Sequence, residues 1–213
     1  MKFLLFVEGQ TEAEALPRFF RKWLDLRLPE PVSVQPIPFR GSGHYVKDIA
    51  QKVRSQMASK AGGEVIACVG LLDLYGLPET ITQNHANWRK LSVAERVSRA
   101  TQTLEQRVNH SKFRQFFAVH ELEAWLLSQP ELFPWTLKRS LEPLALRPEE
   151  VNFTRPPAVR LGEIYRKEGR DFKKTADSVT LFQRLDPHSA AQSCPYLREM
   201  LETLLTLAQE ANH

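Results

Sequence analysis

Short apolar runs, each followed by residues with helical spacing, recur up to about residue 130 of the chain. Residues 2–7 and 64–72 are almost wholly apolar, which is typical of strands covered on both faces in a parallel sheet. Residues 113–119 form a third strand-like segment. Residues 32–39 alternate apolar and polar side chains but carry two prolines, which limits them to an edge strand or a partly irregular one.

The segments between these strands have the pattern of amphipathic helices. Thr11 with Glu14 matches a capping box at the start of the first helix, and Pro17 predicts either a kink or a new helix start. The Gly41-Ser42-Gly43 turn leads into a second helix at about residues 45–59. Ser92 with Glu95 forms another capping box, opening a helix to about residue 109. The core-facing positions of that helix are predicted to be Ala94, Val97, Ala100, Leu104 and Val108.

The last third of the chain has a different pattern. A helical segment follows His120 and breaks at Pro130, residues 141–160 are proline-rich and read as irregular, and an amphipathic helix begins near Pro195. Strands that alternate with helices imply an α/β fold with an open, mainly parallel sheet flanked by helices. We expect this core at residues 1–130 and a mainly helical C-terminal extension, packed on the core, at residues 131–213.

Composition excludes several classes of protein. Of the 213 residues, 42% are hydrophobic and 25% charged, which is the ordinary globular mixture and not that of a disordered chain. Two cysteines are too few for a disulfide framework, no secretion signal or membrane-spanning run is visible, and a cytoplasmic location is expected. The net charge of +4 is compatible with a polyanionic partner but does not require one.

Acidic residues follow three of the predicted strands. Glu8 follows the first strand, Asp73 follows the central one, and Glu121 and Glu123 follow the third. Because functional groups of parallel sheets gather at the carboxyl ends of the strands, we expect Glu8, Asp73 and one later glutamate to converge. Carboxylates this close repel one another unless a cation lies among them, and oxygen ligands favour Mg²⁺ or Mn²⁺. The pattern therefore predicts a metal site of the kind that cleaves phosphodiesters.

Three sequence blocks in this order resemble a bacterial domain-of-unknown-function family placed among the TOPRIM-like proteins. They are VEGQTE at 7–12, LDLYGLP at 72–78 and HELEAWLL at 120–127, and residues 156–161, 165–167 and 194–198 also resemble later blocks of that family. The resemblance covers nearly the whole chain. It implies the fold shared by topoisomerases, primases and OLD-type nucleases, in which a glutamate after the first strand works with an Asp-x-Asp pair to hold metal.

By this resemblance, Glu8 matches the acid/base glutamate and Asp73 the first aspartate. Tyr75 stands where the second aspartate would be, so the site needs another carboxylate, with Glu12, Glu121 and Glu123 as candidates. A lost ligand is equally consistent with a lost activity. The resemblance also implies an ABC-type ATPase partner in phage defence, with DNA or RNA as substrate, and leaves a homo-oligomer open.

Basic residues cluster in the C-terminal third, where they read either as a solvated helix face or as a phosphate-binding surface. The candidates are Arg160, Arg166, Lys167, Lys173 and Lys174, with Lys167 or Arg160 expected to steady a phosphate. Zinc protease chemistry is excluded at His120-Glu121, because the second histidine that it needs is replaced by Ala124.

Two kinds of function follow from these patterns. The first is a metal-dependent nuclease of bacterial defence type, with Glu8 and Asp73 as ligands, Glu8 doubling as proton shuttle, and Glu121 and Lys167 as further catalytic candidates. The second is a non-catalytic interaction subunit that kept the fold, docking a partner through exposed helices and the region of Trp125 and Trp135. A nucleotide sensor using the same crevice is a third alternative.

Overall fold

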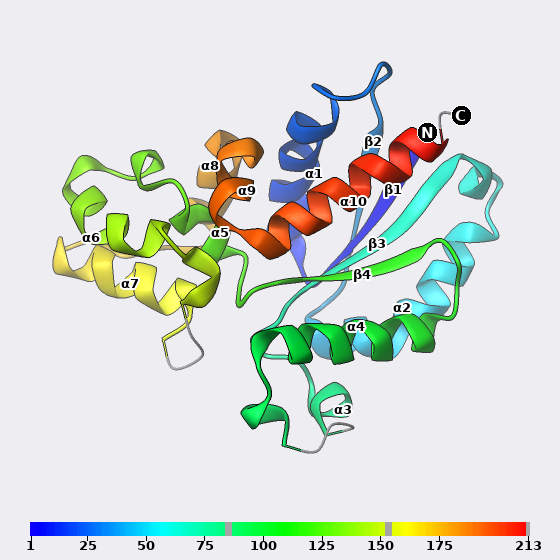
Figure 1. Cartoon of the computed structure of the whole chain (residues 1–213), viewed down its shortest axis with the longest axis horizontal. Coiled ribbons are helices and arrows are strands. Elements are labelled where there is room, and N and C mark those ends of the chain that lie inside the picture. The colour runs from blue at the N-terminus through cyan, green and yellow to red at the C-terminus, as the bar shows by residue number, and fades with distance from the viewer. Residues whose placement is uncertain (84–86, 152–154, 212–213) are drawn as a thin grey trace.

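A computed structural model describes residues 1–83, 87–151 and 155–211 of the chain. Its centre is a four-stranded sheet in the order β2-β1-β3-β4, and all three strand pairs are parallel (Figure 1). The strands are β1 (Lys2–Val7), β2 (Ser33–Pro38), β3 (Val65–Asp73) and β4 (Phe113–Ala118). The open parallel sheet predicted from the sequence is confirmed.

Burial explains the order of the strands. The two most apolar strands, β1 and β3, lie at the centre, where helices cover both faces. The proline-containing β2 lies at an edge, as predicted, because a proline cannot donate to a neighbouring strand. Val7 pairs with Leu71, and Asp73 pairs with Ala118, so the carboxyl ends of these strands meet at one edge.

Helices cover both faces of the sheet (Figure 1). Helices α1 (Gln10–Leu24) and α10 (Pro195–Ala211) share one hydrophobic core with the odd-numbered residues of β1. Helices α2 (Ser42–Met57) and α4 (Val93–Val108) share a second core with the even-numbered residues. The period-two alternation of strand side chains thus divides the apolar residues between two cores.

The remaining helices form a group beyond the carboxyl edge of the sheet (Figure 1). They are α5 (Glu123–Leu127), α6 (Trp135–Ala145), α7 (Pro157–Lys167), α8 (Lys174–Arg184) and α9 (Pro187–Ser193). Trp125 of α5 joins this group to the core, with its ring centroid 5.8 Å from that of Phe19 and 6.3 Å from that of Phe182. Shorter helical turns lie at α3 (Glu79–Thr82), η1 (Lys60–Glu64), η2 (Trp88–Lys90), η3 (Pro130–Leu132) and η4 (Pro148–Glu150).

Several local predictions are corrected by the structure. Helix α1 begins at Gln10 with Gly9 as N-cap and without a side-chain cap, so the capping box expected at Thr11 does not form. Of the two alternatives at Pro17, a new helix start is wrong, because α1 continues through the proline. Helix α2 begins at Ser42, three residues earlier than predicted.

Other corrections concern α4 and the proline-rich segment. The capping box at Ser92 is confirmed, but Ala94 is exposed while Arg96 is buried. The segment read as irregular includes the second half of α6 and the start of α7. The helix predicted near Pro195 is confirmed as α10. Within the described residues, no helix is long and apolar enough to cross a membrane.

Candidate functional site at the carboxyl edge of the sheet

Backbone hydrogen bonds join the loops that follow the four strands. The N–H of Gly41 donates to the carbonyl oxygen of Glu8 at 3.0 Å, linking the loops after β2 and β1. The N–H of Tyr75 donates to the carbonyl oxygen of His120 at 2.9 Å, linking the loops after β3 and β4. Gly41 has a φ of 95°, a region that favours glycine. These bonds fix the positions of the acids that leave the strand ends.

Glu8 lies between the end of β1 and Gly9, the N-cap of α1, and is partly exposed. Glu12, in the first turn of α1, reaches back toward it: a Cβ atom on Gly9 would lie 3.2 Å from Glu12 Oε2. Gly9 has an extended backbone with φ of −153°, which any residue adopts, and a side chain at this position would only require the flexible end of Glu12 to shift slightly. The carboxylate of Glu12 therefore lies against the loop that carries Glu8.

Asp73 is the last residue of β3 and is partly exposed. Its Oδ1 accepts a hydrogen bond of 3.0 Å from the backbone N–H of Leu122, in the loop after β4. Because β1 and β3 are neighbours and Val7 pairs with Leu71, Glu8 and Asp73 lie at adjacent strand ends. The two acids that the sequence placed after the first and central strands therefore follow neighbouring strands of the sheet.

The two later glutamates are buried and turn toward the C-terminal helices. Glu121 Oε2 accepts from the backbone N–H of Ala158, in the first turn of α7, at 2.9 Å. Glu123 Oε1 accepts from the Ser178 hydroxyl of α8 at 3.4 Å. Among the described residues, no three His, Cys, Asp or Glu side chains form a group that could hold a metal ion. The described residues therefore do not form a metal site with three or more such protein ligands.

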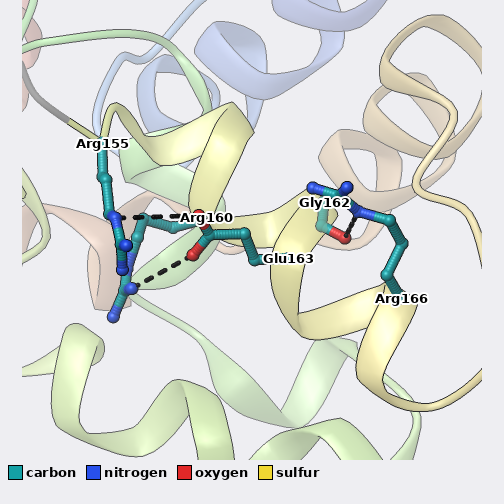
Figure 2. A network of polar contacts seen from close by, with 5 residues as sticks. All are labelled: Arg155, Arg160, Gly162, Glu163 and Arg166. Atoms are coloured by element: carbon teal, nitrogen blue, oxygen red, sulfur yellow. Dashed lines mark hydrogen bonds and ion pairs between the residues drawn. The ribbon is translucent and has the colours of Figure 1, made fainter.

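The basic candidates lie on α7 and at the start of α8. Arg160 Nη1 is 3.3 Å from Glu163 Oε2, Arg155 Nε is 3.8 Å from the other oxygen of that carboxylate, and the Arg166 side chain donates to the Gly162 carbonyl oxygen (Figure 2). The exposed Lys167 ends α7, about 14 Å along the helix axis from Ala158 at a rise of ~1.5 Å per residue.

Two further candidates are at the start of α8. Lys173 is exposed and is the N-cap of that helix, whereas the side chain of Lys174 lies outside the described part of the structure. Of all the basic candidates, Arg160 lies nearest along the chain to Ala158, the residue that binds Glu121.

Three titratable residues near this edge were not selected from the sequence as site residues. Glu149 accepts the backbone N–H groups of Tyr196 and Leu197 at 2.9 and 3.2 Å, and burial raises the pKa of its carboxyl to about 7. Burial, and then the charge of Arg96, lower the pKa of His120 to about 4. Of these three residues, only His120 could have been selected from the sequence, because it follows the predicted strand at residues 113–119. The partners of Glu149 and Arg96 come together only in the folded chain.

Two cavities adjoin the strand ends. One, of about 650 Å³, is lined by the residues that follow Asp73, namely Leu74 to Leu77, together with Trp88 and Arg96. The other, of about 590 Å³, is lined by Arg96, His120, Arg147, Glu149 and Tyr196, among others. Both volumes are in the usual range of ligand sites.

The four-stranded parallel sheet, with acids and two cavities at its carboxyl edge, defines an α/β protein of the open parallel class. The chain belongs to the family described as "Domain of unknown function (DUF4276)", which matches residues 7–205. No curated protein matches the chain.

Two solved structures are similar over nearly the whole chain. The C-terminal region of the Xanthomonas campestris pv. campestris OLD protein is 16% identical, covers 99% of this chain and 97% of its own, and has a TM-score of 0.43. The C-terminal region of the Burkholderia pseudomallei OLD protein is 18% identical, covers 94% of this chain and 95% of its own, and has a TM-score of 0.46. These values are too low to carry an activity over to this chain.

Proposed function

We propose that this protein is a metal-dependent nuclease that cleaves phosphodiesters at the carboxyl edge of its sheet. The observation that carries the proposal is the placement of Glu8 and Asp73 at the ends of adjacent central strands. The sequence blocks around both residues resemble those of TOPRIM-like proteins, which adds support independent of the geometry.

The donor set fits Mg²⁺ or Mn²⁺ in one particular way. Mg²⁺ is commonly held by one or two carboxylates, with water and substrate phosphate supplying the remaining oxygens. Glu8 and Asp73 would provide these carboxylates, and Glu12, which lies against the Glu8 loop, is the best-placed third candidate. Glu123 is turned toward Ser178 and would have to change its side-chain conformation to take part.

The residues of the chain have separate parts in this chemistry. The Leu122 N–H orients the carboxylate of Asp73. Glu8, partly exposed at the end of β1, would hold and release a proton at its carboxylate oxygens during attack and departure. Arg160 would steady a substrate phosphate, with Lys167 farther along the same helix. The bound cation supplies charge neutralisation for the phosphate.

The partner and setting are carried by the resemblance alone. It favours a bacterial defence effector in the cytoplasm, acting on DNA or RNA with an ABC-type ATPase. Co-purification of the tagged chain from its native host, followed by identification of bound proteins, tests this part separately from catalysis.

Cleavage of labelled DNA and RNA, single- and double-stranded, with Mg²⁺ or Mn²⁺ tests the proposal. We expect metal-dependent products that disappear in Glu8→Gln and Asp73→Asn. Glu14→Gln is the matched control, since Glu14 is an exposed glutamate of α1. Products that persist in both site variants, or that do not need metal, would contradict the proposed site.

A second candidate function is an interaction subunit without catalysis. Trp135 and Leu146, at the two ends of α6, are 85% and 78% exposed, so both side chains are available for a partner to cover. Trp125, the other tryptophan expected to dock, is fully buried and cannot. If Trp135→Ser abolishes partner capture while Asp73→Asn leaves partner-dependent function intact, the interaction subunit is the better description.

A further inference from the structure

Three cavities follow one another from the carboxyl edge of the sheet into the C-terminal helices. The cavity beside Tyr75 and the cavity beside His120 share Arg96 in their walls. The second cavity shares Arg147 and Glu150 with a third, of about 500 Å³, that Arg155 and Arg160 also line. Residues common to two cavities place those cavities side by side, so the three adjoin in series.

We propose that these cavities form a track that holds a single strand of nucleic acid. This inference rests on the proposed function and names its substrate class. The track is the three cavities just described, beginning at Tyr75, two residues beyond Asp73.

Positive charge occurs along the whole track. Arg89 and Arg96 line the first cavity, Arg96 and Arg147 the second, and Arg147, Arg155 and Arg160 the third. Arg96 is 9% exposed and is fixed by the carbonyl oxygens of Trp88 and Arg89, at 3.1 and 2.8 Å. A cation held in place in a cavity wall loses little side-chain entropy on binding a phosphate.

Acids offset only part of this charge: among the described residues, five arginines and three glutamates line the three cavities. Glu79 lines the first cavity, and Glu163, beside the third, is paired with the two arginines at that end. Glu149 is engaged by two N–H groups at the start of α10. Glu150 is 3.4 Å from Arg147, and both side chains are largely exposed. An exposed pair of this kind contributes little stability, so a phosphate can replace Glu150 as the partner of Arg147.

Aromatic rings occur in the first two cavities. Tyr75 and Trp88 line the first and Tyr196 lines the second, and Tyr75 is 40% exposed. Unpaired bases stack on such rings whatever their identity, while the ring faces of paired bases are already stacked in a duplex. Each cavity is also of a size for a small ligand and not for a double helix. Arginines interleaved with aromatics therefore favour a single strand.

Fluorescence anisotropy tests the track without any cleavage. The probe is labelled oligothymidylate of about 16 nucleotides, the upper end of common single-strand site sizes, in buffer with EDTA. We expect Arg147→Ala to raise Kd about fivefold and to reduce the slope of log Kd against log salt by about 0.7, the value for one lost phosphate contact on a single strand.

A second pair of variants tests stacking. Tyr75→Ala should raise Kd about fivefold or more, and Tyr75→Phe, which keeps the ring, should bind like the wild type. The matched control is Arg139→Ala, since Arg139 is an exposed arginine of α6 that lines none of the three cavities. It should bind within about twofold of the wild type.

Three results would overturn the track: no binding of the single strand, equal weakening by Arg139→Ala and Arg147→Ala, or equal or tighter binding of the matching duplex. The proposed function fails separately. Single-strand binding in EDTA without cleavage in metal would retain the track and refute the nuclease, whereas cleavage unaffected by Arg147→Ala and Tyr75→Ala would retain the nuclease and refute the track.

Discussion

Asp73 has a structural role that two substitutions separate from its proposed chemical role. Its Oδ1 accepts the Leu122 N–H at 3.0 Å, and Leu122 is buried. Asp73→Ala removes this acceptor and leaves a donor in a poorly hydrated place, at a cost of about 1–2 kcal/mol. Asp73→Asn keeps an oxygen acceptor of the same shape and removes only the charge, so it should cost less than about 1 kcal/mol.

Thermal unfolding and metal-dependent cleavage are measured on both variants. For a chain of this length, the Asp73→Ala cost corresponds to a decrease in Tm of about 3–6 °C, while Asp73→Asn should change Tm by about 2 °C or less. Cleavage should be lost in both, since an amide oxygen is a much weaker ligand for Mg²⁺ than a carboxylate. Asp171→Asn, at an exposed aspartate, controls for loss of charge alone.

Two results would refute this reasoning about Asp73. Full cleavage by Asp73→Asn would show that the negative charge is not needed and would remove Asp73 from the metal site. Equal Tm values for Asp73→Ala and the wild type would show that the bond to Leu122 does not stabilise the loop after β4.

Three other predictions concern stability. A Cβ on Gly70 would overlap the Tyr45 hydroxyl and the side-chain oxygen of Gln115, which hydrogen-bond to each other at 2.7 Å. Gly70→Ala should therefore lower the free energy of unfolding, measured by urea titration, by about 3 kcal/mol or more. A cost below about 1 kcal/mol would contradict the close approach. Burial raises the pKa of Glu149 from 4.5 to about 7. Between these pH values the folded chain binds a proton that the unfolded chain does not. The free energy of unfolding should therefore fall by up to about 3 kcal/mol as the pH rises through this range. Urea titrations at pH 5 and pH 8 should show a smaller fall in Glu149→Gln, and an unchanged fall would exclude Glu149 as its source. Ser92→Ala removes the N-cap side chain of α4 and should lower the free energy of unfolding by about 1 kcal/mol in the same titration. An unchanged free energy of unfolding would show that the Ser92 cap does not stabilise the helix.

The strands could be predicted because their signal is local. Each residue of β3 up to Leu72 is buried, so the run of apolar residues ends where the burial ends and Asp73 marks the boundary. Helix starts were harder. Both Thr11 and Ser92 begin a capping-box pattern, yet only Ser92 is a cap, because the two-residue loop Glu8-Gly9 after β1 brings the chain into α1 before Thr11.

Prolines misled the interpretation of residues 141–160. A cluster of prolines predicts a break in helical structure, but proline is also favoured in the first turn of a helix, where its missing N–H has no partner to lose. Pro157 starts α7 in this way, Pro148 starts η4, and Pro143 lies inside α6. Sequence spacing does not distinguish these uses of the residue.

The partners of the later glutamates could not be predicted, because they are distant in sequence. Glu121 binds the N–H of a residue 37 positions away, and Glu123 binds a hydroxyl 55 positions away. A buried carboxylate that accepts an N–H from the first turn of a helix has an ordinary structural role, favoured by the helix dipole. The acids after β4 therefore have a structural explanation that local sequence does not reveal.

This explanation limits which carboxylates can serve a cation. Turning Glu121 or Glu149 toward the strand ends would leave partly or fully buried N–H donors without an acceptor, at about 1–3 kcal/mol for each donor. The acids around β1 and β3 are partly exposed and do not carry this cost to the same degree. Two or three such carboxylates hold Mg²⁺ firmly only when phosphate oxygens complete the coordination. Firm binding of Mg²⁺ at this acidic edge therefore requires a bound polyanion, and the arginines of the proposed track lie where they would bind its phosphates.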